Sequence, residues 1–217
     1  MEVLLYLPVL LLSVVAHEFA HAWVALRQGD DTAYKLGRVT LNPLPHIDLV
    51  GSVLFPMLLW MTQAGFLFGW ARPVPVDPRK YRSYRRGDIL VSLAGISANL
   101  LLALAFTIAT VLLIWLGRHI PALAASAALM TRMSGYGVEI NLLLAFFNLI
   151  PIPPLDGSHV VYHLLPPRLG ARYREMGRYG MLVLLAILFF APGILSFFLW
   201  PVSELQRLAR AFIGMWI

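Results

Sequence analysis

Long apolar runs, separated by short polar stretches, dominate the chain. The runs lie at about residues 3–26, 49–70, 87–117, 138–155 and 179–200. A helix needs about 20 mostly apolar residues to cross a bilayer. The pattern therefore predicts an all-α polytopic membrane protein with about four full transmembrane helices. The run 49–70 is interrupted by three glycines and a proline, so we expect it to be a re-entrant or partial segment.

The polar stretches predict smaller elements. Residues 34–48 alternate apolar and polar positions up to an Asn42-Pro43 stop, which predicts a small β-hairpin-like loop. A helix is expected to start near Gly137, and an amphipathic tail is expected over 202–217. With no internal repeat, the whole chain is expected to be one membrane-embedded domain, with a core over 1–165 and an accessory helix at 179–200.

Composition agrees with a membrane protein. Of the 217 residues, 59% are hydrophobic and 13% are charged, whereas soluble domains carry about 25% charged residues. The net charge of +6 does not indicate nucleic-acid binding, because the cations lie between the apolar runs and not along one face. The chain has no cysteine, which excludes disulfides and thiolate metal ligands. The N-terminus lacks a basic stretch and a cleavage site, so we expect it to be retained.

The first apolar run contains His17-Glu18-Phe19-Ala20-His21, an HExxH motif. On a helix, residues i and i+4 share a face, so both imidazoles can reach one metal ion. Glu18 then lies beside the metal-bound water as a general base. Chance HExxH matches are common in soluble helices, but ionisable residues at membrane depth are costly and usually functional. The motif predicts a zinc site with His17 and His21 as ligands.

A catalytic zinc site needs a third protein ligand and an open position. The candidate is Asp156, which follows a helix broken by Pro151, Pro153 and Pro154. Irregular backbone at membrane depth is tolerated where it lines a cavity or is buried in protein. The alternative is that Asp156 only caps a helix starting at Gly157.

Three segments carry a resemblance to a known family. HEFAH, SLAGISAN (92–99) and NLIPIPPLDG (148–157) resemble the motifs of the site-2 protease family, peptidase family M50, in its compact form without a PDZ or CBS domain. GRVTLNPLPHID (37–48) and FGWARPVPVDP (68–78) are similar to linkers of a small subfamily. Departures are Ile96, where the family often has proline, and Ser158-His159 after the LDG motif.

The resemblance implies one zinc ion, Glu18 as general base, and hydrolysis of a peptide bond in or next to a substrate's transmembrane segment. It also implies that Asn148 holds the substrate backbone or the reacting carbonyl. The expected partners are transmembrane-segment protein substrates and the lipid bilayer, with no nucleic acid. The alternative function is a non-proteolytic zinc-binding scaffold or partner-binding homologue, against which the intact Glu18 argues.

The metal site constrains the topology. His17, His21 and Asp156 lie late in their segments, so they share a depth only if those segments run parallel, which requires 49–70 not to cross fully. Under this topology one face receives thirteen lysines and arginines and the other receives four; a full crossing would give ten and seven. The positive-inside rule favours the first split. We expect an integral membrane protein with its active site toward the cytoplasmic side, as in a prokaryotic cell membrane.

Other polar residues allow two interpretations each. His46 and Asp48 either tune the site or belong to a capped, solvated loop. Asn99 either faces the metal site or makes an interhelical hydrogen bond, and Asn141 is expected to make a packing contact. His159 and His163 are interpreted as interfacial histidines and not as a second metal site. Residues 34–48 are expected to line the water route, and their strand edge to pair with an unwound substrate.

Overall fold

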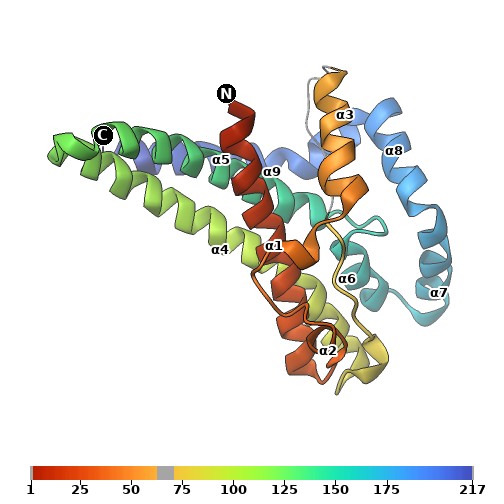
Figure 1. Ribbon diagram of the computed structural model, residues 1–217. Helices are drawn as coiled ribbons and strands as arrows, with labels where there is room; N and C mark the ends of the chain where they lie inside the picture. The colour runs from red at the N-terminus through yellow and green to blue at the C-terminus, as the bar shows by residue number, and fades with distance from the viewer. Residues whose placement is uncertain (1, 63–70, 217) are drawn as a thin grey trace. The chain divides into compact units, whose positions relative to one another are not determined.

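The computed structural model describes residues 2–62 and 71–216, and these residues contain helices but no strand. The chain divides into two compact units, residues 14–95 and residues 1–13 with 96–217. The helices α1 and α4 each contribute to both units. The α-helices in chain order (Figure 1) are α1 (Glu2–Gln28), α2 (Thr32–Lys35), α3 (Phe55–Met61), α4 (Tyr84–His119), α5 (Ala124–Asn148), α6 (Asp156–Leu164), α7 (Pro167–Met176), α8 (Gly180–Phe190) and α9 (Pro192–Gly214).

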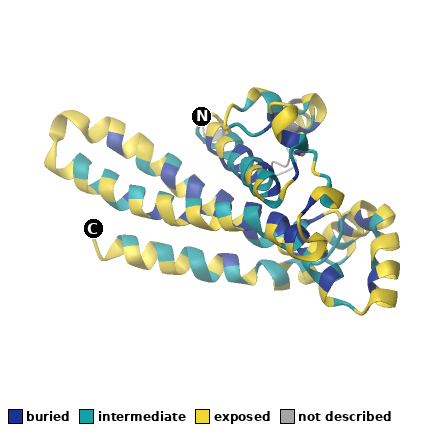
Figure 2. Ribbon diagram, turned by 90° about the horizontal axis from the view of Figure 1, so that it is seen from below, coloured by how far each residue is buried: buried dark blue, intermediate teal, exposed yellow. Residues whose placement is uncertain are grey.

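Two of the described helices are long and apolar enough to cross a membrane, α1 from Leu4 to Gln28 and α4. A third span results if the pair Pro167–Phe190 and Pro192–Gly214, which is bent by 92°, counts as one. Much of the helical surface is exposed (Figure 2), and on α4 and α8 it includes large apolar side chains, among them Leu101, Leu104, Leu182 and Phe190. Apolar surface of this extent is typical of contact with lipid.

In the unit of residues 14–95, the second half of α1 packs against its neighbours through small residues. Ala22 and Ala33 form a buried cluster with Val74, and Val39 packs against them. Ala25 forms a second cluster with Tyr81 and Val91 at the start of α4. Val74 belongs to residues 71–77, a segment without helix or turn that we call the strap. Alanine on α1 lets the strap and α4 approach the helix closely.

In the other unit, α4, α5 and α9 run side by side (Figure 1). Their buried core consists of Ala103, Val138, Leu142 and Val202, with Phe106 packed against it. A second core forms where the chain leaves α5, around Ile150, Leu155 and Leu184. This second core holds the proline-containing turn that precedes α6.

A buried polar network connects α1, α4 and α5 in the same unit. Asn99 donates hydrogen bonds from Nδ2 to the Ser13 carbonyl (3.3 Å) and to Asn141 Oδ1 (2.8 Å). Asn141 donates from its Nδ2 to Ser13 Oγ and to the Gly137 carbonyl, both at 2.8 Å. Asn99, Asn141 and Ser13 are all fully buried. Asn99 thus makes an interhelical hydrogen bond, which was one of the two roles considered for it. Asn141 makes the packing contact that was expected.

Because this network is buried, we expect Asn99→Leu to destabilise the protein by about 1–2 kcal/mol, since the Asn141 carbonyl loses its donor. The double variant Asn99→Leu/Asn141→Leu should lose less than the sum of the two single variants. Reversible unfolding in mixed micelles measures all four proteins. Losses that add within about 0.5 kcal/mol would show that the two amides act independently.

The β-hairpin expected over 34–48 is wrong. The Asp30 carboxylate accepts a hydrogen bond from the Thr32 amide (3.0 Å), and the chain forms the helical turn α2 there. Gly37, with a φ of 67°, then reverses the chain. After Pro43, a 3₁₀ turn over Leu44–His46 replaces the second strand. No strand edge is present in 34–48, so the expected pairing with a substrate at this edge loses its basis.

Three other expectations differ from the structure or are not confirmed by it. The helix expected from Gly137 begins at Ala124, and α5 is not among the helices that are long and apolar enough to cross a membrane. The single helix expected over 179–200 bends sharply at Ala191, because helical backbone is disfavoured for the residue before a proline, here Pro192. Among the described residues, two or three helices are candidate spans, so the expected count of four is not confirmed. In the run 49–70, Leu49–Leu54 is a π-helix and α3 follows; residues 63–70 lie outside the described part.

Candidate metal centre

The two histidines of the HExxH motif face one another on α1. The Nε2 atoms of His17 and His21 lie 2.9 Å apart, and their rings meet edge to face with centroids 4.5 Å apart. His17 is buried. The i, i+4 spacing on a helix produces this pairing, as the sequence predicts.

A backbone carbonyl fixes the protonation of His21. Its Nδ1 lies 2.7 Å from the Val91 carbonyl oxygen on α4. Because a carbonyl can only accept, Nδ1 carries the proton and donates it, and in the neutral ring Nε2 keeps its lone pair. Metal-binding histidines usually donate their second N–H in this way, which orients the ring.

The spacing of these nitrogens fits a metal ion. Two imidazoles bound tetrahedrally at about 2.0–2.1 Å place their nitrogens about 3.3 Å apart. The observed 2.9 Å is within a few tenths of an ångström of that value. Without an ion, the same distance suits a hydrogen bond in which His17 Nε2–H donates to the lone pair of His21 Nε2. A bound cation would take the place of that proton. The pair therefore suits a zinc ion.

Gly95 on α4 provides the space that the histidines occupy. A Cβ atom at this position would lie 2.5 Å from His17 Cε1, 2.5 Å from His21 Nε2 and 2.7 Å from His17 Nδ1. Any side chain would overlap both rings. The sequence contains the position within SLAGISAN, but no residue pattern indicated that a glycine sits against the two predicted metal ligands. We add Gly95 to the residues that form the site.

Glu18, the third functional residue of the motif, contacts the strap. Its Oε2 accepts a hydrogen bond from the Val74 amide at 2.7 Å. The strap has two further backbone anchors: the Arg72 amide donates to the His46 carbonyl (2.8 Å), and the Asp77 amide donates to Asp30 Oδ2 (2.6 Å). Pro73 and Pro75 lie between these donor residues and have no backbone N–H that would need a partner. The strap therefore holds the carboxylate of Glu18 in one orientation.

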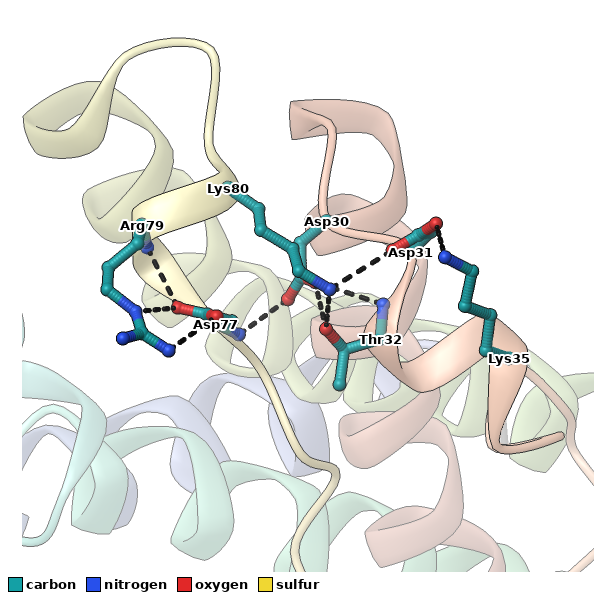
Figure 3. Close-up of polar contacts among 7 residues, drawn as sticks. All are labelled: Asp30, Asp31, Thr32, Lys35, Asp77, Arg79 and Lys80. Carbon is teal, nitrogen blue, oxygen red and sulfur yellow. Dashed lines mark hydrogen bonds and ion pairs between the residues drawn. The ribbon is translucent and has the colours of Figure 1, made fainter.

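The outer end of the strap is fixed by a polar cluster (Figure 3). Asp30 is fully buried there and accepts bonds from Thr32 and from the Asp77 amide, with Lys80 Nζ 3.7 Å away. Arg79 holds the pKa of Asp77 below its ordinary value through hydrogen bonds, and Lys35 with Lys80 does the same for Asp31. These carboxylates stay ionised well below neutral pH, so the cluster keeps its charge pairing over the physiological range.

Asp156 belongs to the other unit, where it is the first residue of α6 after the proline-containing turn. The glycine that follows it is packed against backbone: a Cβ on Gly157 would lie 2.2 Å from the Leu149 carbonyl oxygen. Only glycine, which has no side chain, allows the first turn of α6 to lie so close to the end of α5. This close packing fixes the position of Asp156, the first residue of α6. The sequence showed the Asp-Gly pair but not this contact.

The remaining predicted residues have these positions. Asn148 ends α5 and donates to the Leu144 carbonyl at 2.9 Å. Asp48 caps the π-helix through Val50 and Gly51, as the loop interpretation has it. His46 is buried and not solvated; its Nε2 lies 3.0 Å from the Thr40 carbonyl, and its Nδ1 has no hydrogen-bond partner. His159 and His163 have the i, i+4 spacing of a shared helix face, but His159 is exposed and His163 is buried.

Comparison with known proteins identifies the family. The model for "Peptidase family M50" matches residues 116–191, which include Asn148 and Asp156. The chain is 40% identical over 198 residues to the "Putative zinc metalloprotease YwhC" of Bacillus subtilis (strain 168), covering 91% of this chain and 85% of that protein.

The "Putative zinc metalloprotease Rip2" of Mycolicibacterium smegmatis is 32% identical, over 82% of this chain and 64% of its own length. The protein of the same name from Mycobacterium tuberculosis (strain H37Rv) is 33% identical, over 87% and 67%. No solved structure matches the chain. The extent of the similarity to YwhC is sufficient for one conclusion: the chain belongs to peptidase family M50, the site-2 protease family.

Proposed function

We propose that the protein is a zinc-dependent intramembrane endopeptidase that cleaves a peptide bond in or next to a transmembrane segment of a membrane protein. The observation that carries the proposal is the pair of facing Nε2 atoms on α1, with Glu18 between the two histidines in sequence and held by the strap. The family membership and the names of the relatives support peptidase and zinc chemistry. The apolar helices α1 and α4 support a membrane location.

We assign one zinc ion to His17, His21 and Asp156. These side chains offer two imidazole nitrogens and one carboxylate oxygen. Catalytic zinc sites use such sets of three protein ligands and keep a fourth position open for water or substrate. The orientation of His21 by Val91 and the close packing of Gly95 and Gly157 support a site with little freedom.

Glu18 is the general base in this proposal. When bound, zinc lowers the pKa of a water molecule and polarises the scissile carbonyl. Glu18 Oε2 is held by the Val74 amide, and we assign proton transfer to its other oxygen. That oxygen takes the proton of the attacking water and passes it to the amine that leaves. Asn148 is assigned to hold the substrate backbone, as the family resemblance implies.

The proposal also includes location. In the topology expected from the sequence, one face receives thirteen lysines and arginines and the other receives four, and on that basis we place the active site toward the cytoplasmic side of the membrane. The test of the function is a comparison of membrane proteins in cells that produce the wild-type chain or Glu18→Gln. Membrane proteins that accumulate at full length only with Glu18→Gln are the substrates. Identical sets of fragments in both cells would refute proteolysis.

Removal of zinc should abolish activity reversibly. With a model transmembrane peptide as substrate, a membrane-permeant zinc chelator is expected to lower cleavage to below about 1% and added zinc to restore it, because the reaction depends on the bound ion. Asp156→Ala should lower the zinc content to a small fraction of the wild-type value. Glu204→Ala removes a half-buried carboxylate on α9 that pairs with Arg207, and is the matched control. Full zinc content in Asp156→Ala would exclude Asp156 as a ligand.

A further inference from the structure

A cavity of about 440 Å³ lies in the unit of residues 14–95, and the proposed mechanism does not use it. Its lining residues are Leu36, Arg38, Arg72, Pro73 and Pro75. Ligand sites commonly have volumes of about 300–1,000 Å³. The cavity therefore has the size of a binding site for a side chain with some flanking backbone.

Its charge is positive. Arg38 is only 8% exposed and donates a hydrogen bond to the Pro45 carbonyl, and Arg72 lines the same cavity. Within the described part of the chain, neither guanidinium has a carboxylate ion-pair partner. Burial and the charge of Arg72 lower the pKa of Arg38, while the charge of Glu18 raises it. Arg38 is buried and Arg72 is exposed, and their two positive charges repel each other. A bound anion reduces both this repulsion and the cost of burying the Arg38 charge.

The cavity is lined by the strap, which also holds the proposed catalytic base. Pro73 and Pro75, which line it, lie on either side of Val74, the residue whose amide binds Glu18. Arg72, the residue before them, is anchored through its amide to His46. A ligand in the cavity therefore lies against the same short segment that orients Glu18.

We infer that this cavity is a substrate subsite, in which Arg38 and Arg72 bind the carboxylate of an aspartate or glutamate side chain close to the scissile bond. The inference rests on the proposed function and adds substrate specificity to it. Guanidinium groups match carboxylates with two parallel hydrogen bonds, which gives affinity and a defined register. A peptide is favoured over a lipid headgroup because the cavity adjoins the residue that acts on the peptide.

A panel of host peptides tests the subsite. Each host is a leucine-alanine transmembrane peptide with a central Gly-Pro helix break, and one glutamate, or glutamine as its isostere, is moved position by position around the break. The zinc-loaded protein is reconstituted in phosphatidylcholine vesicles, and mass spectrometry identifies the cleavage sites. We expect a preference of at least about tenfold in kcat/KM for glutamate over glutamine at one register, because a charge-assisted bond is lost with glutamine.

The variants connect this preference to the cavity. Arg38→Met and Arg72→Gln should each reduce the glutamate-to-glutamine ratio to below about threefold, and Arg38→Lys should keep part of it because the charge stays. Arg207→Gln is the control, since its side chain lies on α9, is 71% exposed, pairs with Glu204 and belongs to neither the cavity lining nor the strap. If Arg38→Met does not fold, the glutamate-to-glutamine ratio of Arg72→Gln alone tests whether the cavity is the subsite.

The contrary outcomes are distinct. Equal cleavage of glutamate and glutamine hosts by the wild-type protein, or an unchanged ratio in both cavity variants, would overturn the subsite. The same holds if the variants change only a response to added phosphatidylglycerol, because the cavity would then bind a lipid phosphate. No cleavage of any host by the wild-type protein, with the same result for Glu18→Gln, would instead refute the proposed function, and the subsite with it.

Discussion

Glu18→Gln is expected to lower cleavage of a model transmembrane peptide by at least about 1,000-fold while zinc remains bound. Glutamine has the shape of glutamate and can still accept the hydrogen bond of the Val74 amide, so the strap should stay in place. It cannot take a proton from water at neutral pH. General acid–base catalysis contributes about 10²–10⁴-fold in enzymes, and here the same group is assigned both proton transfers. Single-turnover cleavage and zinc content per chain measure the two effects.

The control for this experiment is His17→Ala, which removes a proposed ligand. It should lose both cleavage and zinc, whereas Glu18→Gln should lose only cleavage. Activity of Glu18→Gln above about a tenth of the wild-type value would exclude Glu18 as the base. Loss of zinc in Glu18→Gln would show instead that the carboxylate supports the metal and not the proton transfer.

The part of the site that lies on one helix could be predicted from the sequence. The spacing of His17 and His21 alone determines that their rings share a face of α1, and the structure shows their Nε2 atoms 2.9 Å apart. The position of Glu18 follows from the same helix. Helical periodicity is a local property, so no tertiary information was needed.

The residues that act across elements could not be predicted in this way. The Val91 carbonyl that orients His21 and the Val74 amide that binds Glu18 are backbone groups, and their side chains carry no sign of the role. Gly95 acts by having no side chain at all. Such contacts depend on how α4 and the strap pack on α1, which a single sequence does not show. The assignment of Asp156 as third ligand stays a prediction.

The wrong fold predictions have a common cause. Alternation over 34–41 resembles a strand, but the buried Asp30 carboxylate binds the Thr32 amide and starts a helical turn just before it. The apolar window 138–155 resembles a span, but it joins the end of α5 to the proline-containing turn, and α5 itself begins fourteen residues earlier, at Ala124. In both cases a short hydrophobic pattern does not determine which element forms or where it begins.

Gly95→Ala is expected to lower zinc content to below about a tenth of the wild-type value and cleavage by at least about 100-fold. The added methyl group would lie 2.5 Å from both His17 Cε1 and His21 Nε2. The overlapping atoms are the far ends of rotatable side chains, so the rings can swing away while α1 and α4 keep their packing. That movement takes Nε2 of His21 out of position and weakens the bond from its Nδ1 to Val91. Metal sites lose about 10–100-fold in affinity or activity when only such supporting contacts are removed.

The same addition of a methyl group at Gly135 on α5 is the matched control, because a Cβ there has no atom within 4 Å among the described residues. Gly135→Ala should keep full zinc content and be slightly more stable, since alanine favours helix. Thermal unfolding separates the two possible effects of Gly95→Ala: a midpoint close to that of the zinc-free wild-type protein shows a folded chain that has lost its metal site. Zinc content equal to the wild-type value in Gly95→Ala would mean that the ligands do not lie against this glycine when the metal is bound, and the assignment of His17 and His21 Nε2 as the zinc-binding atoms would have to be abandoned.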